Sequence, residues 1–140
     1  MRRIFSALLL ICVGCGTSTD VESQVTITQG LYGQLTQTCS TMGCVGAPRE
    51  GAPVAWFDRS PYATDGGMNP APLQEGVSGK NGFYQFALDS NVHGYLAIGE
   101  LRPTNGVQYF TATALVIPHG LARVDWHAGP GNDGTWTDVR

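Results

Sequence analysis

The amino-acid sequence predicts an all-β protein, a sandwich of two antiparallel sheets with about seven strands. Nineteen glycines and eight prolines divide the chain into short segments, and the 3.6-residue hydrophobic period of an amphipathic helix is not sustained anywhere. Several short segments instead alternate apolar and polar residues, as half-buried strands do. Short strands at regular spacing, with little helix, are typical of two packed antiparallel sheets.

The expected strands follow one another along the body of the chain. Residues 25–35 carry apolar side chains at alternate positions, and we expect this strand to bend at Gly30 or Gly33. Residues 60–76 contain three prolines and predict a long loop. The Lys-Asn-Gly sequence of residues 80–82 predicts a turn. Further strands are expected at residues 53–58, 83–89, 95–99, 108–117, 122–127 and 135–139.

The N-terminus has the layout of a secretory signal peptide. Arg2 and Arg3 precede a run of apolar and small residues, 4–13, and the first acidic residue is Asp20. This run is too short to cross the roughly 30 Å hydrocarbon core of a bilayer as a helix. A buried N-terminal core helix is the alternative, but the run is not amphipathic.

Residues 13–16, Val-Gly-Cys-Gly, resemble the lipobox of bacterial lipoproteins. The resemblance implies that a lipoprotein signal peptidase removes residues 1–14 and that Cys15 becomes the N-terminus, anchored in a membrane by fatty-acyl chains such as palmitate. Cys12 stands where that family usually has leucine, and the bulky Ile11 before it disfavours Cys12 as the acylated residue. An ordinary secreted protein, cut nearby, is the alternative.

A lipid anchor implies a location in the cell envelope, facing the periplasm or the cell surface. Gly16 follows the acylated cysteine where some lipoproteins have aspartate, and this resembles the signal for export to the outer rather than the inner membrane. Residues 15–24 are then an acylated N-terminus with a polar linker. Residues 25–140 have the size of a single β-sandwich domain.

The charge of the mature chain argues against nucleic acid as a partner. Without Arg2 and Arg3, six basic and eleven acidic residues remain, a net charge of −5 with neutral histidines. No basic cluster is left to contact a phosphate backbone.

Two cysteines remain in the predicted domain. An oxidising envelope favours a disulfide between Cys39 and Cys44, which would close a short loop and stabilise the fold by about 2 kcal/mol. The alternative is a soft metal site formed by both sulfurs and Met42.

Four stretches resemble the carboxypeptidase regulatory-like family. They are residues 30–36 (GLYGQLT), 46–58 (GAPREGAPVAWFD), 79–88 (GKNGFYQFAL) and 93–98 (HGYLAI). The resemblance implies a Greek-key sandwich of the transthyretin or immunoglobulin type, and a non-catalytic accessory, adhesive or carrier-associated role. Three features depart from the family: the CSTMGC insertion, Gly79 in place of aspartate, and a chain after Gly99 that matches no family motif.

We expect no enzyme activity and no cofactor. The Gly-Phe-Tyr-Gln-Phe segment at residues 82–86 also resembles intradiol dioxygenases, which bind iron through two tyrosines and two histidines, but their closely spaced His-x-His is missing. No serine lies in a Gly-x-Ser-x-Gly nucleophile elbow.

The best candidate for a metal site is Asp125 with His127, which alternate onto one face of a strand, joined by His119. The favoured interpretation is that these residues form the solvated face of a strand whose other face buries Val124 and Trp126. The Gly-Asn-Asp-Gly sequence at residues 131–134 offers oxygen ligands for calcium, but a turn explains it more simply.

Two functions fit these observations. We expect a protein-interaction or envelope-assembly module, whose partner is an envelope or surface protein. The alternative is a carbohydrate-binding accessory module, in which aromatic rings stack on the sugars of a polysaccharide. Trp56 and Trp126 lie within predicted strands and are expected in the core, which leaves Tyr62 and Trp136 as candidate ligand contacts.

Overall fold

The computed structural model describes residues 21–39, 46–62, 69–129 and 134–139, which contain nine strands and two short 3-10 helices. The strands are β1 (Gly30–Gln37), β2 (Ala47–Pro48), β3 (Pro53–Phe57), β4 (Gln74–Val77), β5 (Phe83–Ala87), β6 (His93–Arg102), β7 (Gly106–Val116), β8 (Leu121–Ala128) and β9 (Gly134–Val139). The helices are η1 (Val21–Gln24) and η2 (Lys80–Gly82).

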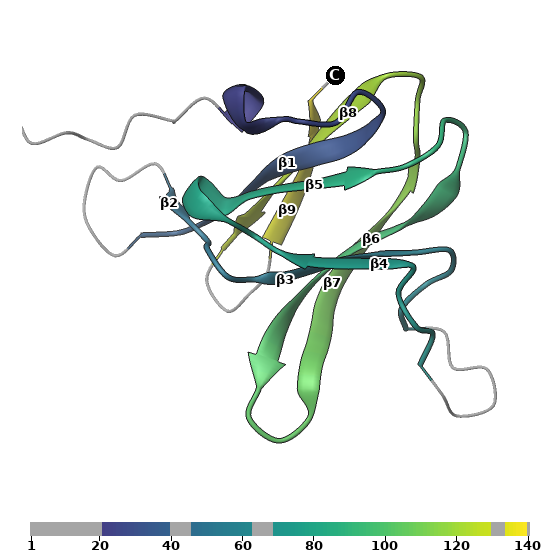
Figure 1. Ribbon diagram of the computed structural model, residues 1–140. Helices are drawn as coiled ribbons and strands as arrows, with labels where there is room; N and C mark the ends of the chain where they lie inside the picture. The colour runs from purple at the N-terminus through teal and green to yellow at the C-terminus, as the bar shows by residue number, and fades with distance from the viewer. Residues whose placement is uncertain (1–20, 40–45, 63–68, 130–133, 140) are drawn as a thin grey trace, which may run out of the picture.

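The strands form two sheets that pack as a sandwich (Figure 1). One sheet, the β1 sheet, has the order β2-β1-β8-β9, and β5 also pairs with β1. The other, the β3 sheet, has the order β4-β3-β6-β7. The chain changes sheets after β2, β4, β5 and β7. The all-β sandwich that the sequence predicts is confirmed.

One strand pair departs from the expected antiparallel arrangement. β1 and β8 run parallel, whereas the other pairs among the described strands are antiparallel. The two strands are distant in sequence, so nothing local fixes their relative direction. Their pairing nevertheless places strands from the beginning and the end of the chain side by side in the β1 sheet (Figure 1).

All seven expected strands are present, with changed boundaries. The sequence analysis missed β2, which has two residues, and β4, which lies inside the expected loop at residues 60–76. All four residues of β4 are exposed, so no hydrophobic alternation marks it. The expected turn at residues 80–82 is confirmed: Asn81 and Gly82 both have positive φ, 61° and 73°.

The segment before β1 differs from the prediction. Residues 25–29 alternate apolar and polar side chains but are not a strand, and β1 begins only at Gly30, whose φ is 130°. Val21–Gln24, expected to belong to the polar linker, forms η1, in which Val21 is 4% exposed. Glu22 of η1 pairs with Arg123 at 3.3 Å. The linker therefore folds back onto the sandwich at its C-terminal end.

The core lies between the two sheets and contains both tryptophans that the sequence places there. Trp56 and Trp126 are essentially fully buried. On β5, Tyr84 and Phe86 point inward while Phe83 and Gln85 are only partly buried, as the alternation predicts. The β1 sheet and the β3 sheet thus share one main hydrophobic cluster.

A β-bulge interrupts the pairing of β6 and β7. Ile98 pairs with Thr111, but Gly99 pairs with Tyr109, so that Phe110 is an extra residue on β7. Phe110 packs inward, 5.6 Å from the ring of Trp126. Thr111 also faces inward, because its hydroxyl accepts a 3.2 Å hydrogen bond from the indole of Trp136. The bulge turns Tyr109 to the opposite, outer face of the sheet.

Candidate functional site

The outer face of the β3 sheet is built of small apolar residues. Paired residues on neighbouring strands point to the same side of a sheet, so the pairs Ala55 with Ala97 and Ala97 with Ala112 place three alanines in one row across it. Ala55 and Ala97 are fully buried in a second cluster, separate from the main core, which also contains Phe57. Outer faces of antiparallel sheets usually carry polar side chains, whereas the centre of this face is apolar and already buried within the chain.

Aromatic rings pack against this row of small residues. Tyr95 and Tyr109 pack against the second cluster, and Tyr109 meets Phe57 edge-to-face, with ring centroids 5.1 Å apart and an interplanar angle of 88°. Gly99 is the residue opposite Tyr109. A Cβ at Gly99 would lie 3.1 Å from Cδ1 of Tyr109 and 3.0 Å from Cγ1 of Val107, which is too close. The glycine therefore lets both side chains cross β6.

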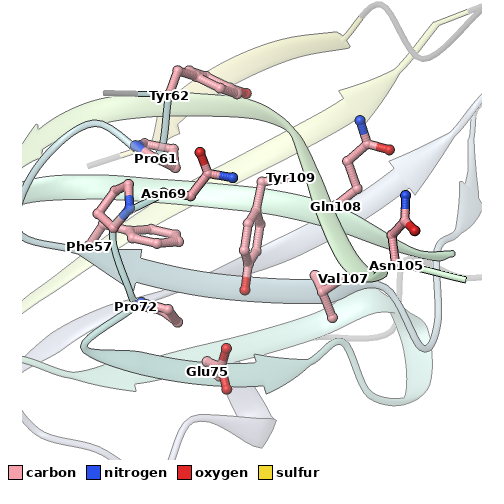
Figure 2. A pocket seen from close by; sticks show the side chains of 11 residues that line it. Phe57, Pro61, Tyr62, Asn69, Pro72, Glu75, Asn105, Val107, Gln108 and Tyr109 are labelled. Atoms are coloured by element: carbon pink, nitrogen blue, oxygen red, sulfur yellow. The ribbon is translucent and has the colours of Figure 1, made fainter. Parts of the chain in front are cut away.

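A groove of about 770 Å³ opens above these rings (Figure 2). We call it the outer groove. Its described lining residues are Phe57, Pro61, Tyr62, Asn69, Pro70, Pro72, Glu75, Asn105, Val107, Gln108 and Tyr109. They come from β3, from the segments on either side of residues 63–68, from β4, and from the β6–β7 hairpin. The groove therefore depends on the tertiary fold rather than on one segment.

Tyr109 and Glu75 form a pair across the outer groove. In Figure 2 the Tyr109 ring points from β7 toward Glu75 on β4. Burial, the negative charge of Glu75 and the hydrogen bond that the Tyr109 hydroxyl donates to this carboxylate together raise the pKa of Tyr109. The hydroxyl therefore stays protonated and remains a donor. Among the described lining residues, Glu75 is the single charged group.

Exposed aliphatic side chains extend the same face beyond the groove. Val77 lies opposite Pro53, Leu101 opposite Val107, and Val116 opposite His93, and all of these pairs are in register with the outer-face positions. Leu101 is 69% and Val107 41% exposed. The β6–β7 hairpin that carries them extends away from the rest of the sandwich (Figure 1). Exposed aliphatic side chains that gather beside a groove mark a binding site more often than isolated ones do.

The two aromatic residues predicted to be ligand contacts, Tyr62 and Trp136, lie in different environments. Tyr62 lines the outer groove and is 54% exposed. Trp136 is partly buried: it packs against the main core and its indole donates to Thr111. Trp136 is therefore not part of the groove, and its expected exposure is corrected. The interior holds it because β9 and β7 approach each other at the edge of the sandwich.

Sequence reasoning missed Tyr109, Phe57 and Glu75 as members of the site. Phe57 looks like an ordinary strand residue, and Glu75 falls within a segment that has no strand pattern. Tyr109 is adjacent to the bulge, where simple alternation fails. The one usable signal is an alanine in each of β3, β6 and β7, with two at alternate positions on β7, which leaves room on one face of the sheet.

Asp125 and His127, the candidate metal ligands, are engaged in the sheet. The carboxylate of Asp125 accepts a 2.9 Å hydrogen bond from the backbone N–H of Gln34 and pairs with Arg123 at 3.1 Å. Nδ1 of His127 lies 2.8 Å from the Thr36 hydroxyl. Among the described residues, no group of three His, Cys, Asp or Glu side chains could hold a metal ion.

The remaining features of this strand agree with the favoured interpretation. Val124 and Trp126, on the opposite face of β8, are 2% and 1% exposed, as expected. His119 is exposed in the turn between β7 and β8. Asp125 compensates for an interruption of the ladder, because Gly33 and Gln34 have no paired residue on β8. Its role is to satisfy a backbone donor.

Several predicted sites lie outside the described residues. They are residues 1–20 with the acyl acceptor Cys15, the segment 40–45 with Cys44 and Met42, and residues 131–133 of the Gly-Asn-Asp-Gly sequence. Cys39 is partly buried just after β1, and its disulfide with Cys44 stays a prediction. None of the helices among the described residues is long and apolar enough to span a membrane.

Comparisons of the chain with protein-family models, with curated proteins and with solved structures found no match.

Proposed function

We propose that this chain is a lipid-anchored, non-catalytic interaction module of the cell envelope that docks a partner protein on the outer face of the β3 sheet. The observation that carries the proposal is the set of exposed aliphatic side chains on this face beside the outer groove, Val77 on β4 with Leu101 and Val107 at the projecting hairpin. Burying such side chains against a partner stabilises a complex by about 25 cal/mol per Å² of apolar area.

The aliphatic residues favour a protein over a glycan. Sugar rings stack well on aromatic faces, but the aliphatic side chains of Val77, Leu101 and Val107 offer no hydrogen bond to the hydroxyl groups that a glycan would bury there. The aromatic and amide residues of the outer groove keep a carbohydrate ligand as the second candidate. The two candidates occupy the same face, so one experiment separates them.

The fold of the linker bears on where docking takes place. Because η1 packs on the sandwich from Val21 onward, five residues separate the proposed anchor, Cys15, from the folded domain. These can span at most about 20 Å. A lipid-anchored domain on so short a tether stays close to the membrane surface, where a membrane-bound or membrane-proximal envelope protein is within reach.

Site-specific photo-crosslinking in the native cells tests the proposal. A photoreactive amino acid replaces Leu101 in the full-length lipoprotein, and in a matched control it replaces Leu121, which is also an exposed leucine, 42% exposed, but lies on β8 of the other sheet. We expect a discrete protein adduct from position 101 and none from position 121. Adducts of equal yield from both positions, or polysaccharide recovered without protein, would contradict the proposal.

A further inference from the structure

We infer that the outer groove receives a lysine or arginine side chain of the partner protein, whose charged end meets the Glu75 carboxylate beside the ring of Tyr109. This inference rests on the proposed function and names the chemistry of the docking contact. It starts from the charge of the groove: Glu75 is the single charged residue among the described lining residues, and none of them is Lys, Arg or His. A cation therefore meets one negative charge and no positive one.

The Glu75 carboxylate has capacity for a further donor. An ionised carboxylate offers about four acceptor positions, and the Tyr109 hydroxyl, which points toward Glu75 (Figure 2), can fill only one of them. When the partner excludes water, a charge-assisted hydrogen bond at this position becomes stronger than it is at an exposed surface.

The aromatic rings supply the second half of the site. A cation is attracted to the face of an aromatic ring within about 6 Å of its centroid. Phe57 is almost completely buried and meets Tyr109 edge-to-face, so its function is to hold the Tyr109 ring upright. Tyr62, which is more than half exposed, lines the same groove from the loop side (Figure 2). Tyr109 is therefore the ring beside Glu75, and Tyr62 lies at the other end of the groove (Figure 2).

The same fold already contains a guanidinium group seated on two aromatic rings. The guanidinium carbon of Arg49 lies 5.1 Å from the ring centroid of Phe110 and 5.5 Å from that of Trp126. These rings lie on the inner side of the bulge, and Tyr109 lies on its outer side. The bulge thus points Phe110 to the inner face and Tyr109 to the outer face of the β3 sheet, and the chain's own arginine lies over the inner ring.

The net charge of the mature chain acts in the same direction. A net charge of −5 attracts basic partner surfaces and repels acidic ones over the Debye length of about 8 to 10 Å. Phosphorylated or otherwise anionic ligands would approach Glu75 without a compensating cation in the groove. A neutral glycan would instead bind through the amides of Asn69, Asn105 and Gln108, and it is an opposing outcome of the experiment.

The test uses the detergent-solubilised mature lipoprotein and a pair of short peptides. One peptide carries a single arginine between leucines, and the other carries the neutral isostere citrulline in its place. We expect the arginine peptide to bind about tenfold more tightly at low salt, with the difference falling as salt is raised. Glu75→Gln should remove the difference, and Tyr109→Leu should weaken both peptides. Asp89→Asn, which removes an exposed carboxylate elsewhere, is the control and should bind as wild type does.

The outcomes separate this inference from the proposed function. Equal binding of the two peptides by the wild type, or binding of a neutral oligosaccharide that Glu75→Gln leaves unchanged, overturns the cation site. If the peptides are too short to bind measurably, the photo-crosslinking experiment is repeated with the Glu75→Gln variant. An adduct yield at position 101 equal to that of the wild type then overturns the cation site. In each of these cases a discrete adduct at position 101 still supports docking on this face.

Discussion

Gly33 on β1 lies directly opposite Tyr84 on β5, and its missing side chain lets the Tyr84 hydroxyl cross the strand. The hydroxyl donates a hydrogen bond to the carbonyl of Val124 on β8, the strand on the far side of β1. The parallel ladder between β1 and β8 is interrupted at this point, so the tyrosine satisfies a buried acceptor that no backbone donor of β1 reaches. One glycine thus ties three strands of the β1 sheet together.

Gly33→Ala should destabilise the protein by about 2 to 4 kcal/mol. A Cβ at this position would overlap the Val124 carbonyl and lie 2.8 Å from the Tyr84 hydroxyl, so the hydrogen bond and the strand spacing cannot both survive. Urea denaturation measures the change. Gly79→Ala is the matched control, because its nearest contact is 3.8 Å away, and a loss of stability as large as that of Gly33→Ala would refute this account.

Alkaline pH should unfold the protein through Tyr84. Burial, and then the negative charge of Asp125, raise the pKa of Tyr84 well above the usual tyrosine value of 10.0. In the unfolded chain the phenol loses its proton near that usual value, whereas in the folded protein it keeps it. The unfolded state therefore binds fewer protons above about pH 10, and the free energy of unfolding falls as the pH rises.

Tyr84→Phe separates this titration from other effects of base. Phenylalanine lacks the ionisable group, so the variant should lose about 1 kcal/mol at neutral pH, with the hydrogen bond, and then show a shallower decline above pH 10. Thermal melts between pH 7 and pH 11 provide the comparison. Parallel declines in the wild type and the variant would show that Tyr84 does not control alkaline stability.

The tryptophan of the β3 sheet should depend on a glycine on the neighbouring strand. A Cβ at Gly94 on β6 would overlap the indole of Trp56 on β3, so Gly94→Ala should cost about 2 to 3 kcal/mol through overpacking. In a Trp56→Leu background the same substitution should cost less, and the remaining cost comes from the backbone carbonyl oxygen of Phe57, which the new Cβ would also overlap. A double-mutant cycle that gives simple additivity would show that the two residues do not interact.

Asp125 should prove to be a structural residue. Asp125→Ala leaves the Gln34 N–H without its acceptor, and we expect a loss of about 1 to 3 kcal/mol. His127→Ala, at an exposed position on the same face, should stay within about 0.5 kcal/mol. A chelator should leave the Tm of the wild type unchanged. A zinc-dependent rise in Tm that both substitutions abolish would instead establish a metal site.

Local sequence signals predicted the strands because the information needed for them is local. The alternation of Tyr84 and Phe86 with Phe83 and Gln85, and the Asn-Gly pair at residues 81–82, each act within a few residues. The same signals failed where pairing partners decide the structure. Residues 25–29 alternate apolar and polar side chains but have no adjacent strand to pair with. β4 pairs with β3 although its residues show no such alternation.

The candidate site shows the same division. Tyr62 could be named from the sequence because a loop residue is exposed in most folds. Trp136 could not be distinguished from it, since only the approach of β9 to β7 brings its indole to Thr111. Strict alternation along β7 would place Tyr109 and Ala112 on opposite faces, and the extra residue Phe110 puts both on the outer face.

The sequence by itself determined the all-β class, seven of the strands and the burial of Trp56 and Trp126, because hydrophobic period and turn chemistry are properties of short segments. The tertiary structure decided that the outer face of the β3 sheet is apolar as well as the inner one, and which side chains meet on it. Phe57, Glu75 and Tyr109 lie on three strands of that sheet, and their meeting depends on strand order, register and one bulge. Those quantities are fixed by contacts between residues far apart in the chain, and no local pattern encodes them.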